Sequence, residues 1–225
     1  MSLRGEKTRP CCYDSKGANR LNIHWNQFVA LAFMLIAASI AIYFKKRVAA
    51  KPPPRRSNAE PRWLSLLIIV VALALGLATL DGLVRNSPSW FVPTSLKSST
   101  LTLVIVSAAG SLASAVGCIL MYCSLAFLDT NFSGTSGTHS DHVLVTSGPY
   151  QYMRHPYYTA TLLISSGIGL LLQHPAVLGL GLILFGLLSI RSRAEECELE
   201  TKFPLKFRSW QQRTGRFLPR LSPKR

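Results

Sequence analysis

Residues 157–190 have the sequence YYTATLLISSGIGLLLQHPAVLGLGLILFGLLSI, 34 positions without a Lys, Arg, Asp or Glu. Gln173, His174 and Pro175 interrupt this run, and a proline beside two polar residues is typical of the tip of a helical hairpin. Each arm then has about 16 residues, slightly fewer than the roughly 20 that a helix needs to cross a bilayer. Because a hairpin returns to the face it left, the segments before residue 157 and after residue 190 should be neighbours.

Three further uncharged runs precede the hairpin, at residues 26–44, 63–80 and 101–128. Their lengths suit membrane-spanning helices, the longest with some tilt. Charged residues make up only 16% of the chain, whereas soluble domains average about 25%. The sequence therefore predicts an all-α membrane protein of about five transmembrane helices, followed by a cytosolic amphipathic tail helix.

The predicted organisation has four parts. A polar segment at 1–25 contains no early apolar stretch, so no secretory signal is expected. The three spans follow within 26–128, with a basic, proline-rich loop at 45–62. Residues 129–219 hold the hairpin and a C-terminal lid, and 220–225 form a basic tail.

The net charge of +15 comes mainly from basic residues between or after the apolar runs. This placement indicates anionic lipid headgroups and control of topology, and it argues against nucleic acid, for which no binding motif is present. Five cysteines without CxxC spacing predict neither a disulfide framework nor a metal site. The pair Cys11-Cys12 suits free thiols in a tail or sites of lipidation.

Four of the ten acidic residues follow the hairpin within six positions, at Glu195, Glu196, Glu198 and Glu200. The simplest interpretation is a solvated helix start, with Arg191 and Glu195 paired at spacing i, i+4. The hairpin, however, should bring this cluster beside Arg154 and His155. Ionisable groups gathered at a membrane boundary inside a bundle are candidates for a functional site.

The tail carries an apolar stripe. Leu199, Phe203, Phe207 and Trp210 recur at steps of four, four and three, along one face of a helix. Pro204 is expected to restart that helix. The stripe suits either an amphipathic surface helix or a lid over a site beneath it.

The motif LVTSGPYQYMRHPYY at 144–158, followed by a hairpin and by EECELETKF at 195–203, resembles the isoprenylcysteine carboxyl methyltransferase family. That family belongs to a wider group that includes membrane phospholipid methyltransferases. The resemblance covers residues 127–219 and is specific as a combination. The first two spans resemble only generic membrane helices.

The resemblance implies that S-adenosylmethionine binds between these segments, in a pocket open to the cytosol. Its cofactor-binding positions correspond to His142, Leu144, Val145, Gly148, Tyr150, His155, Tyr158 and Glu196. It places Arg154 and Glu195 near the reacting groups. The implied substrate is a prenylated protein or prenylcysteine, methylated at the endoplasmic reticulum membrane without a metal. The chain departs from the family at Pro204, usually Gly, and at Phe207 and Trp210, usually Tyr, which leaves the lid geometry open.

These residue types suit methyl transfer from a sulfonium to a carboxylate. The carboxylate is already ionised at neutral pH and needs no general base, and a dry site favours a reaction that neutralises two charges. Arg154 can fork onto the substrate carboxylate, Glu196 can hold a positive or hydroxyl group of the cofactor, and Tyr150 and Tyr158 can face the sulfonium. Small residues that leave room for close helix packing or for a prenyl tail are Gly110, Gly117, Gly167 and Gly169.

Three other functions fit less well. An amine methyltransferase acting on phosphatidylethanolamine-type lipids would need a base, for which His139 or His142 could serve. Sterol reductases share an acidic, aromatic tail after a hairpin but are usually longer bundles. A non-enzymatic membrane scaffold would not need the complete set of site residues that this chain retains.

The distribution of basic residues predicts the orientation. Suppose that loop 45–62, the loop before the hairpin with Arg154, and the tail from Arg191 all lie in the cytosol. Then 18 basic residues are inside and seven are outside. Reporter fusions after Arg62 and Arg225 should give cytosolic signals, and a fusion after Thr100 an external one. A cytosolic signal at Thr100 would contradict this assignment.

Overall fold

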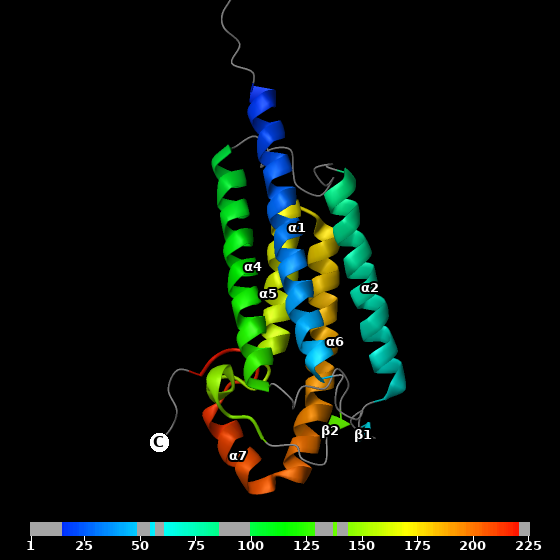
Figure 1. Cartoon of the computed structure of the whole chain (residues 1–225), viewed down its shortest axis with the longest axis vertical. Helices are drawn as coiled ribbons and strands as arrows, with labels where there is room; N and C mark the ends of the chain where they lie inside the picture. The colour runs from blue at the N-terminus through cyan, green and yellow to red at the C-terminus, as the bar shows by residue number, and fades with distance from the viewer. Residues whose placement is uncertain are drawn as a thin grey trace, which may run out of the picture.

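The computed structural model of the chain describes residues 15–48, 55–56, 61–85, 100–128, 137–138 and 144–220. Its elements in chain order are α1 (Ser15–Val48), β1 (Arg55–Arg56), α2 (Arg62–Arg85), α4 (Thr100–Leu128), β2 (Gly137–Thr138), the 3-10 helix η2 (Gly148–Gln151), α5 (Pro156–Leu172), α6 (Pro175–Lys202) and α7 (Pro204–Arg213). The two short strands pair antiparallel, with Arg55 opposite Thr138. Figure 1 shows the five long helices as one bundle, with α7 and the strands at one end.

The predicted all-α membrane protein is confirmed. In the described part of the chain, α1, α2, α4 and α6 are each long and apolar enough to cross a membrane, and α5 is a shorter apolar helix. The prediction of two equal arms is wrong for the second arm, because α6 does not end near residue 190. It continues to Lys202 and carries the acidic cluster on the same helix.

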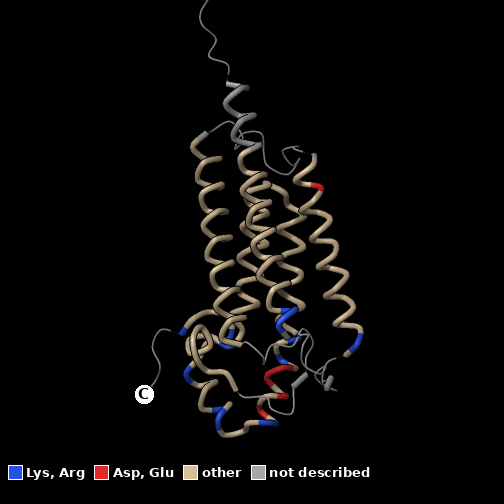
Figure 2. The backbone as a smooth tube through the Cα atoms, in the orientation of Figure 1, with Lys and Arg blue, Asp and Glu red and all other residues tan. Residues whose placement is uncertain are grey.

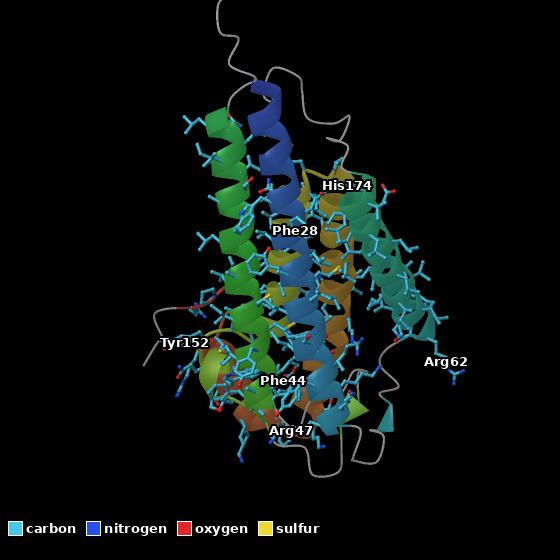
Figure 3. The ribbon with its side chains drawn as sticks, turned by 45° about the horizontal axis from the view of Figure 1, so that its top comes forward. Phe28, Phe44, Arg47, Arg62, Tyr152 and His174 are labelled. Carbon is cyan, nitrogen blue, oxygen red and sulfur yellow. The ribbon has the colours of Figure 1, made fainter. Side chains whose placement is uncertain are left out.

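The apolar section of α6 covers residues 175–190, and the charged extension that follows lies beyond it. In Figure 2 the Lys and Arg residues that are drawn in blue gather at the end of the bundle where this extension and α7 lie. Figure 3 places His174, in the hairpin tip, at the opposite end from Tyr152 in the loop before α5. The hairpin thus runs away from the charged end and returns to it.

The tip of the hairpin lies at Gln173, His174 and Pro175, as the sequence predicted. Gln173 takes the left-handed conformation, with φ 50°, and ends α5. The backbone N–H of His174 donates to the carbonyl of Gly169 at 3.0 Å, and Pro175 begins α6, where its missing N–H costs nothing.

Helices α4 and α5 pack with their backbones unusually close together. A Cβ atom on Gly167 would lie 2.6 Å from the carbonyl oxygen of Gly110 and 2.7 Å from the amide nitrogen of Ser114. A Cβ on Gly117 would lie 2.7 Å from the side chain of Ile164. Of the two roles considered for these glycines, close helix packing is therefore the one that the structure shows.

The two outer helices pack against the hairpin through different neighbours, and Gln27 of α1 donates to Gly82 O of α2 at 3.4 Å. Helix α1 lies against α4 and α5, and α2 lies against α6 and α5. The amide of Asn26 donates to the hydroxyl of Ser107 at 2.8 Å and joins α1 to α4. The remaining face of α2 exposes a stripe of Leu and Val side chains, as expected for a surface that faces lipid.

We expect Gly167→Ala to destabilise the bundle, because its new methyl group would have to push α4 and α5 apart. Overpacking of this kind typically costs about 1–3 kcal/mol. Gly179→Ala is the matched control, since a Cβ at Gly179 meets nothing within 4 Å. Thermal unfolding in detergent should show a lower Tm for Gly167→Ala and an unchanged or slightly higher Tm for the control. Equal shifts would contradict the close packing.

Candidate active site

Residues 144–155, the described part of the loop directly before α5, are held in place by a tight turn at Gly148. Gly148 has φ 60°, in the left-handed region that favours glycine, and a Cβ there would strike the ring of Phe127 at the end of α4. The 3-10 helix η2 follows and buries Tyr150. The chain then reaches Arg154 and His155 directly before Pro156 begins α5. Arg154 and His155 are thus fixed at the start of the hairpin.

Glu196, on the charged extension of α6, is contacted by the side chains of both Arg154 and His155. Arg154 donates through Nε to Glu196 Oε1 at 2.9 Å, and His155 Nε2 lies 3.0 Å from the same oxygen. Arg216 Nε lies 3.4 Å from that oxygen without the geometry of a hydrogen bond. The expected meeting of the loop with the acidic cluster across the hairpin is confirmed.

Glu195, the neighbouring residue, faces the other side of the same histidine. It accepts from the Tyr158 hydroxyl at 2.6 Å and from Arg191 Nε at 3.1 Å, and its Oε2 lies 3.7 Å from His155 Nδ1. The Tyr158 ring stacks on the His155 ring at 5.3 Å, with 8° between the planes. The predicted pair of Arg191 and Glu195 therefore exists, and it is part of this cluster.

The pKa values show which groups hold their charge. Burial alone raises the pKa of Glu196, but hydrogen bonds from His155 and Arg154 and their charges outweigh it and lower the pKa to about 2. This carboxylate therefore stabilises the fold fully above about pH 4.5 and loses that contribution as the pH falls toward 2. Burial, followed by the charge of Glu195, raises the pKa of Tyr150, which stays a neutral phenol.

A segment that the sequence did not single out closes the site. After α7, residues 214–220, here called the C-terminal strap, run beside the loop. The N–H of Arg154 donates to Gly215 O at 2.8 Å and that of His155 to Arg216 O at 3.0 Å. The hydroxyl of Thr159 donates to Phe217 O at 2.7 Å. The strap is thereby held against the two residues that contact Glu196.

Arg154 also reaches the strap with its side chain. Its Nη1 donates to Gln211 O at 3.2 Å and to Thr214 O at 2.8 Å, in addition to the Nε bond to Glu196. Both hydrogens of Nη1 are therefore used. Only Nη2 remains for a ligand, so in this arrangement Arg154 cannot offer the two-nitrogen fork that the sequence suggested.

Helix α7 lies over residues 144–150 as a lid. The expected apolar stripe is divided between two helices, because Leu199 lies on α6 and only Phe207 and Trp210 lie on α7. Phe207 is fully buried, and Trp210 donates through Nε1 to Tyr150 O at 2.8 Å. Both pack with Tyr150 in one cluster that also contains Leu144, Val145, Leu199 and Phe203. Of the two roles considered for this helix, the structure supports the lid. Pro204 fits as the first residue of α7, where its missing N–H leaves no bond unmade.

The sequence-predicted residues fall into three groups. Arg154, His155, Tyr158, Glu195 and Glu196 form the polar cluster. Leu144, Val145 and Tyr150 lie in the apolar cluster under the lid, with Gly148 in the turn before it. His142 lies outside the described residues, as do His139, Cys11 and Cys12. In the part of the chain that is described, no three His, Cys, Asp or Glu residues are grouped to hold a metal ion.

Two residues of the cluster were missed as site members, Arg191 and Arg216. Arg191 was assigned only to a helix-surface pair. Arg216 lies in irregular chain, where no helical or strand periodicity marks which side chains point inward. The resemblance to the family extended to residue 219, but none of the motifs quoted for it included Arg216.

Matches to known proteins include a family model, a bacterial relative and a solved structure. Residues 111–201 match the model of the isoprenylcysteine carboxyl methyltransferase (ICMT) family. The cobalt-zinc-cadmium resistance protein CzcN of Cupriavidus metallidurans is 39% identical over 83 residues, 36% of this chain and 38% of that protein. The structure of the eukaryotic intramembrane Ras methyltransferase ICMT matches with a TM-score of 0.53 and 25% identity, over 69% of this chain and 53% of that one. The chain thus spans about half or less of the length of these two proteins.

We expect Glu196→Gln to loosen the strap, because Arg154 and His155 would lose their shared anion. A hydrogen bond to a charged group typically contributes about 1.5–3 kcal/mol. Glu200→Gln is the matched control. Glu200 accepts from Arg208 at 2.9 Å on the exposed surface, where such pairs contribute about 0–1 kcal/mol.

Thermal unfolding and trypsin cleavage after Arg213 and Arg216 measure the difference. Glu196→Gln should lower the Tm and speed cleavage at the strap, and Glu200→Gln should change neither appreciably. Equal behaviour of the two variants would remove Glu196 as the anchor of the strap.

Proposed function

Because residues 111–201 match the model of the isoprenylcysteine carboxyl methyltransferase family, we propose that the chain belongs to that family and methylates the C-terminal carboxylate of an isoprenylated cysteine. S-adenosylmethionine is the proposed methyl donor. The observation that carries the proposal is the meeting of Arg154 and His155 with Glu195 and Glu196 under an apolar lid, directly beyond the apolar section of α6. The matching family model and the matching solved structure are both those of methyltransferases, which supports a membrane methyltransferase.

The side chains present suit the donor. Carboxylates and aromatic faces favour a cation, and the cluster contains Glu195, Glu196 and the ring of Tyr158. Bound there, S-adenosylmethionine would supply an activated methyl group on a positively charged sulfur. We propose His155, Tyr158 and Glu196 as its polar neighbours, with Tyr150 completing the wall under the lid. His142 remains a further proposed contact.

The chain need not move a proton in this reaction. The acceptor oxygen forms a bond to the methyl carbon while the carbon–sulfur bond breaks, and the electron pair of that bond stays on sulfur. A carboxylate needs no base for this step. The contribution of the protein is to orient the reactants and to exclude water. The buried faces of Phe207 and Trp210 suit the second task.

The position of the site suits an amphipathic acceptor. The apolar section of α6 ends at residue 190, and the polar cluster begins with Arg191 on the next turn. A prenyl tail would stay among the apolar helices while the cysteine carboxylate reaches the cluster. We further propose that this end of the bundle faces the cytosol at the endoplasmic reticulum membrane, as the distribution of basic residues predicts.

Labelled methyl transfer from S-adenosylmethionine to farnesylcysteine analogues and, in parallel, to a lipid extract tests the proposal. We expect the purified protein to label the farnesylcysteine analogue. Labelling of the lipid extract alone would replace the proposed acceptor with a phospholipid. Labelling of neither would overturn both.

We expect Arg154→Ala to reduce both turnover and cofactor affinity, since Arg154 holds Glu196 and the carbonyls of Gln211 and Thr214 together. Loss of a charged hydrogen bond lowers activity by roughly 10- to 150-fold. Arg154→Lys should rescue little, because one ammonium cannot replace Nε and Nη1 at once. Arg208→Ala is the control, on the exposed surface of α7. Normal cofactor affinity and turnover in Arg154→Ala would remove this residue from the site.

A further inference from the structure

The guanidinium of Arg216 is held in a fixed position, and its terminal nitrogens Nη1 and Nη2 are available to a ligand. Its Nε is buried and has no hydrogen-bond partner among the described residues, although Glu196 Oε1 lies 3.4 Å away. Within the described part of the chain Nη1 and Nη2 donate no hydrogen bond, and neither is buried, so both reach accessible space. The side chain as a whole is only 27% exposed. Such an arginine differs from a solvated surface arginine, because its position is fixed while its terminal donors stay available.

Three features fix that position. The carbonyl oxygen of Arg216 accepts from the His155 N–H at 3.0 Å, which ties the backbone to the loop. The guanidinium lies 5.5 Å from the centre of the Phe217 ring, and Glu196 attracts its Nε edge. The edge that carries Nη1 and Nη2 is therefore left to face a ligand. This edge is one of those with which arginine holds a carboxylate by two parallel hydrogen bonds.

The net charge of the cluster is positive, which favours the binding of one more anion. Three guanidinium groups, those of Arg154, Arg191 and Arg216, surround two carboxylates, those of Glu195 and Glu196. One positive charge is in excess even when His155 is neutral. Because Arg154 and Arg191 already pair with the glutamates through hydrogen bonds, the excess lies on Arg216.

We propose that Arg216 is the carboxylate-binding residue of this site. The inference rests on the proposed function, in which both reactants carry a carboxylate: the methyl acceptor at its C-terminus and the cofactor at its methionine part. Arg216 takes the role that the sequence suggested for Arg154. Arg154 instead holds the strap on which Arg216 is carried.

The two sources of the carboxylate predict different kinetics. The acceptor carboxylate loses its charge as the methyl group arrives, so a cation that binds it stabilises the bound substrate at least as much as the transition state. Loss of Arg216 would then raise KM for the acceptor and leave kcat little changed. The cofactor carboxylate takes no part in the reaction. Loss of Arg216 would in that case weaken cofactor binding.

The test compares wild type, Arg216→Ala, Arg216→Gln, Arg216→Lys and the control Arg220→Ala in the full-length protein. Arg220 lies on the same strap but donates to Gln212 O on the exposed surface. Steady-state kinetics with farnesylcysteine and calorimetry with S-adenosylhomocysteine give the two readouts. We expect a 10- to 150-fold rise, roughly, in acceptor KM or in cofactor Kd for Arg216→Ala. Arg216→Lys should recover only part of it, and Arg220→Ala should match wild type.

A rise in acceptor KM alone assigns the acceptor carboxylate to Arg216, and a rise in cofactor Kd alone assigns the cofactor carboxylate. Unchanged values for both, with wild-type turnover, overturn the inference and leave the proposed function intact. Wild-type protein that does not methylate farnesylcysteine overturns the proposed function and the inference with it. If Arg216→Ala does not fold, as judged by its Tm, Arg216→Gln keeps the length of the side chain and decides the result on the same criteria.

Discussion

A carboxylate that is mostly removed from water requires partners, and Glu196 obtains them from two parts of the chain that are distant in sequence. Burying an unpaired carboxylate costs several kcal/mol, on the order of a large part of the net stability of a fold. Arg154 and His155 come from the loop before the hairpin, and Arg216 comes from the strap after α7. The site therefore forms only when the loop, α6 and the strap are all in place.

That convergence needs a rigid support, which the helices beneath provide. The glycines between α4 and α5 allow the two backbones to touch, so the end of α4 and the start of α5 have a fixed separation. The loop between them turns at Gly148, directly on the ring of Phe127, where a larger residue would not fit. Tyr150 then anchors the lid through its carbonyl and its ring. Small residues in the membrane thus position charged residues outside it.

The sequence was informative where the chain obeys a periodicity or a turn preference. The uncharged run at 157–190 and its Gln-His-Pro break predicted the hairpin, and the hairpin predicted that His155 would meet Glu196. The sequence was less informative where backbone groups are the partners. Two of the acceptors of Arg154 are carbonyls of Gln211 and Thr214, which no side-chain pattern encodes. For the same reason the role of the strap could not be foreseen.

The proposed division between the two arginines has a physical basis in what happens to charge during methyl transfer. Hydrogen bonds between Arg154, His155 and Glu196 join groups whose charges do not change, so they are organised before the reaction and require no rearrangement in it. Arg216 is different if its ligand is the acceptor carboxylate, because the ester that forms carries no negative charge. Its attraction for the product is then weaker than for the substrate. An arginine placed at the accessible edge of the cluster, and not at its centre, can therefore favour both capture of the acid and release of the ester.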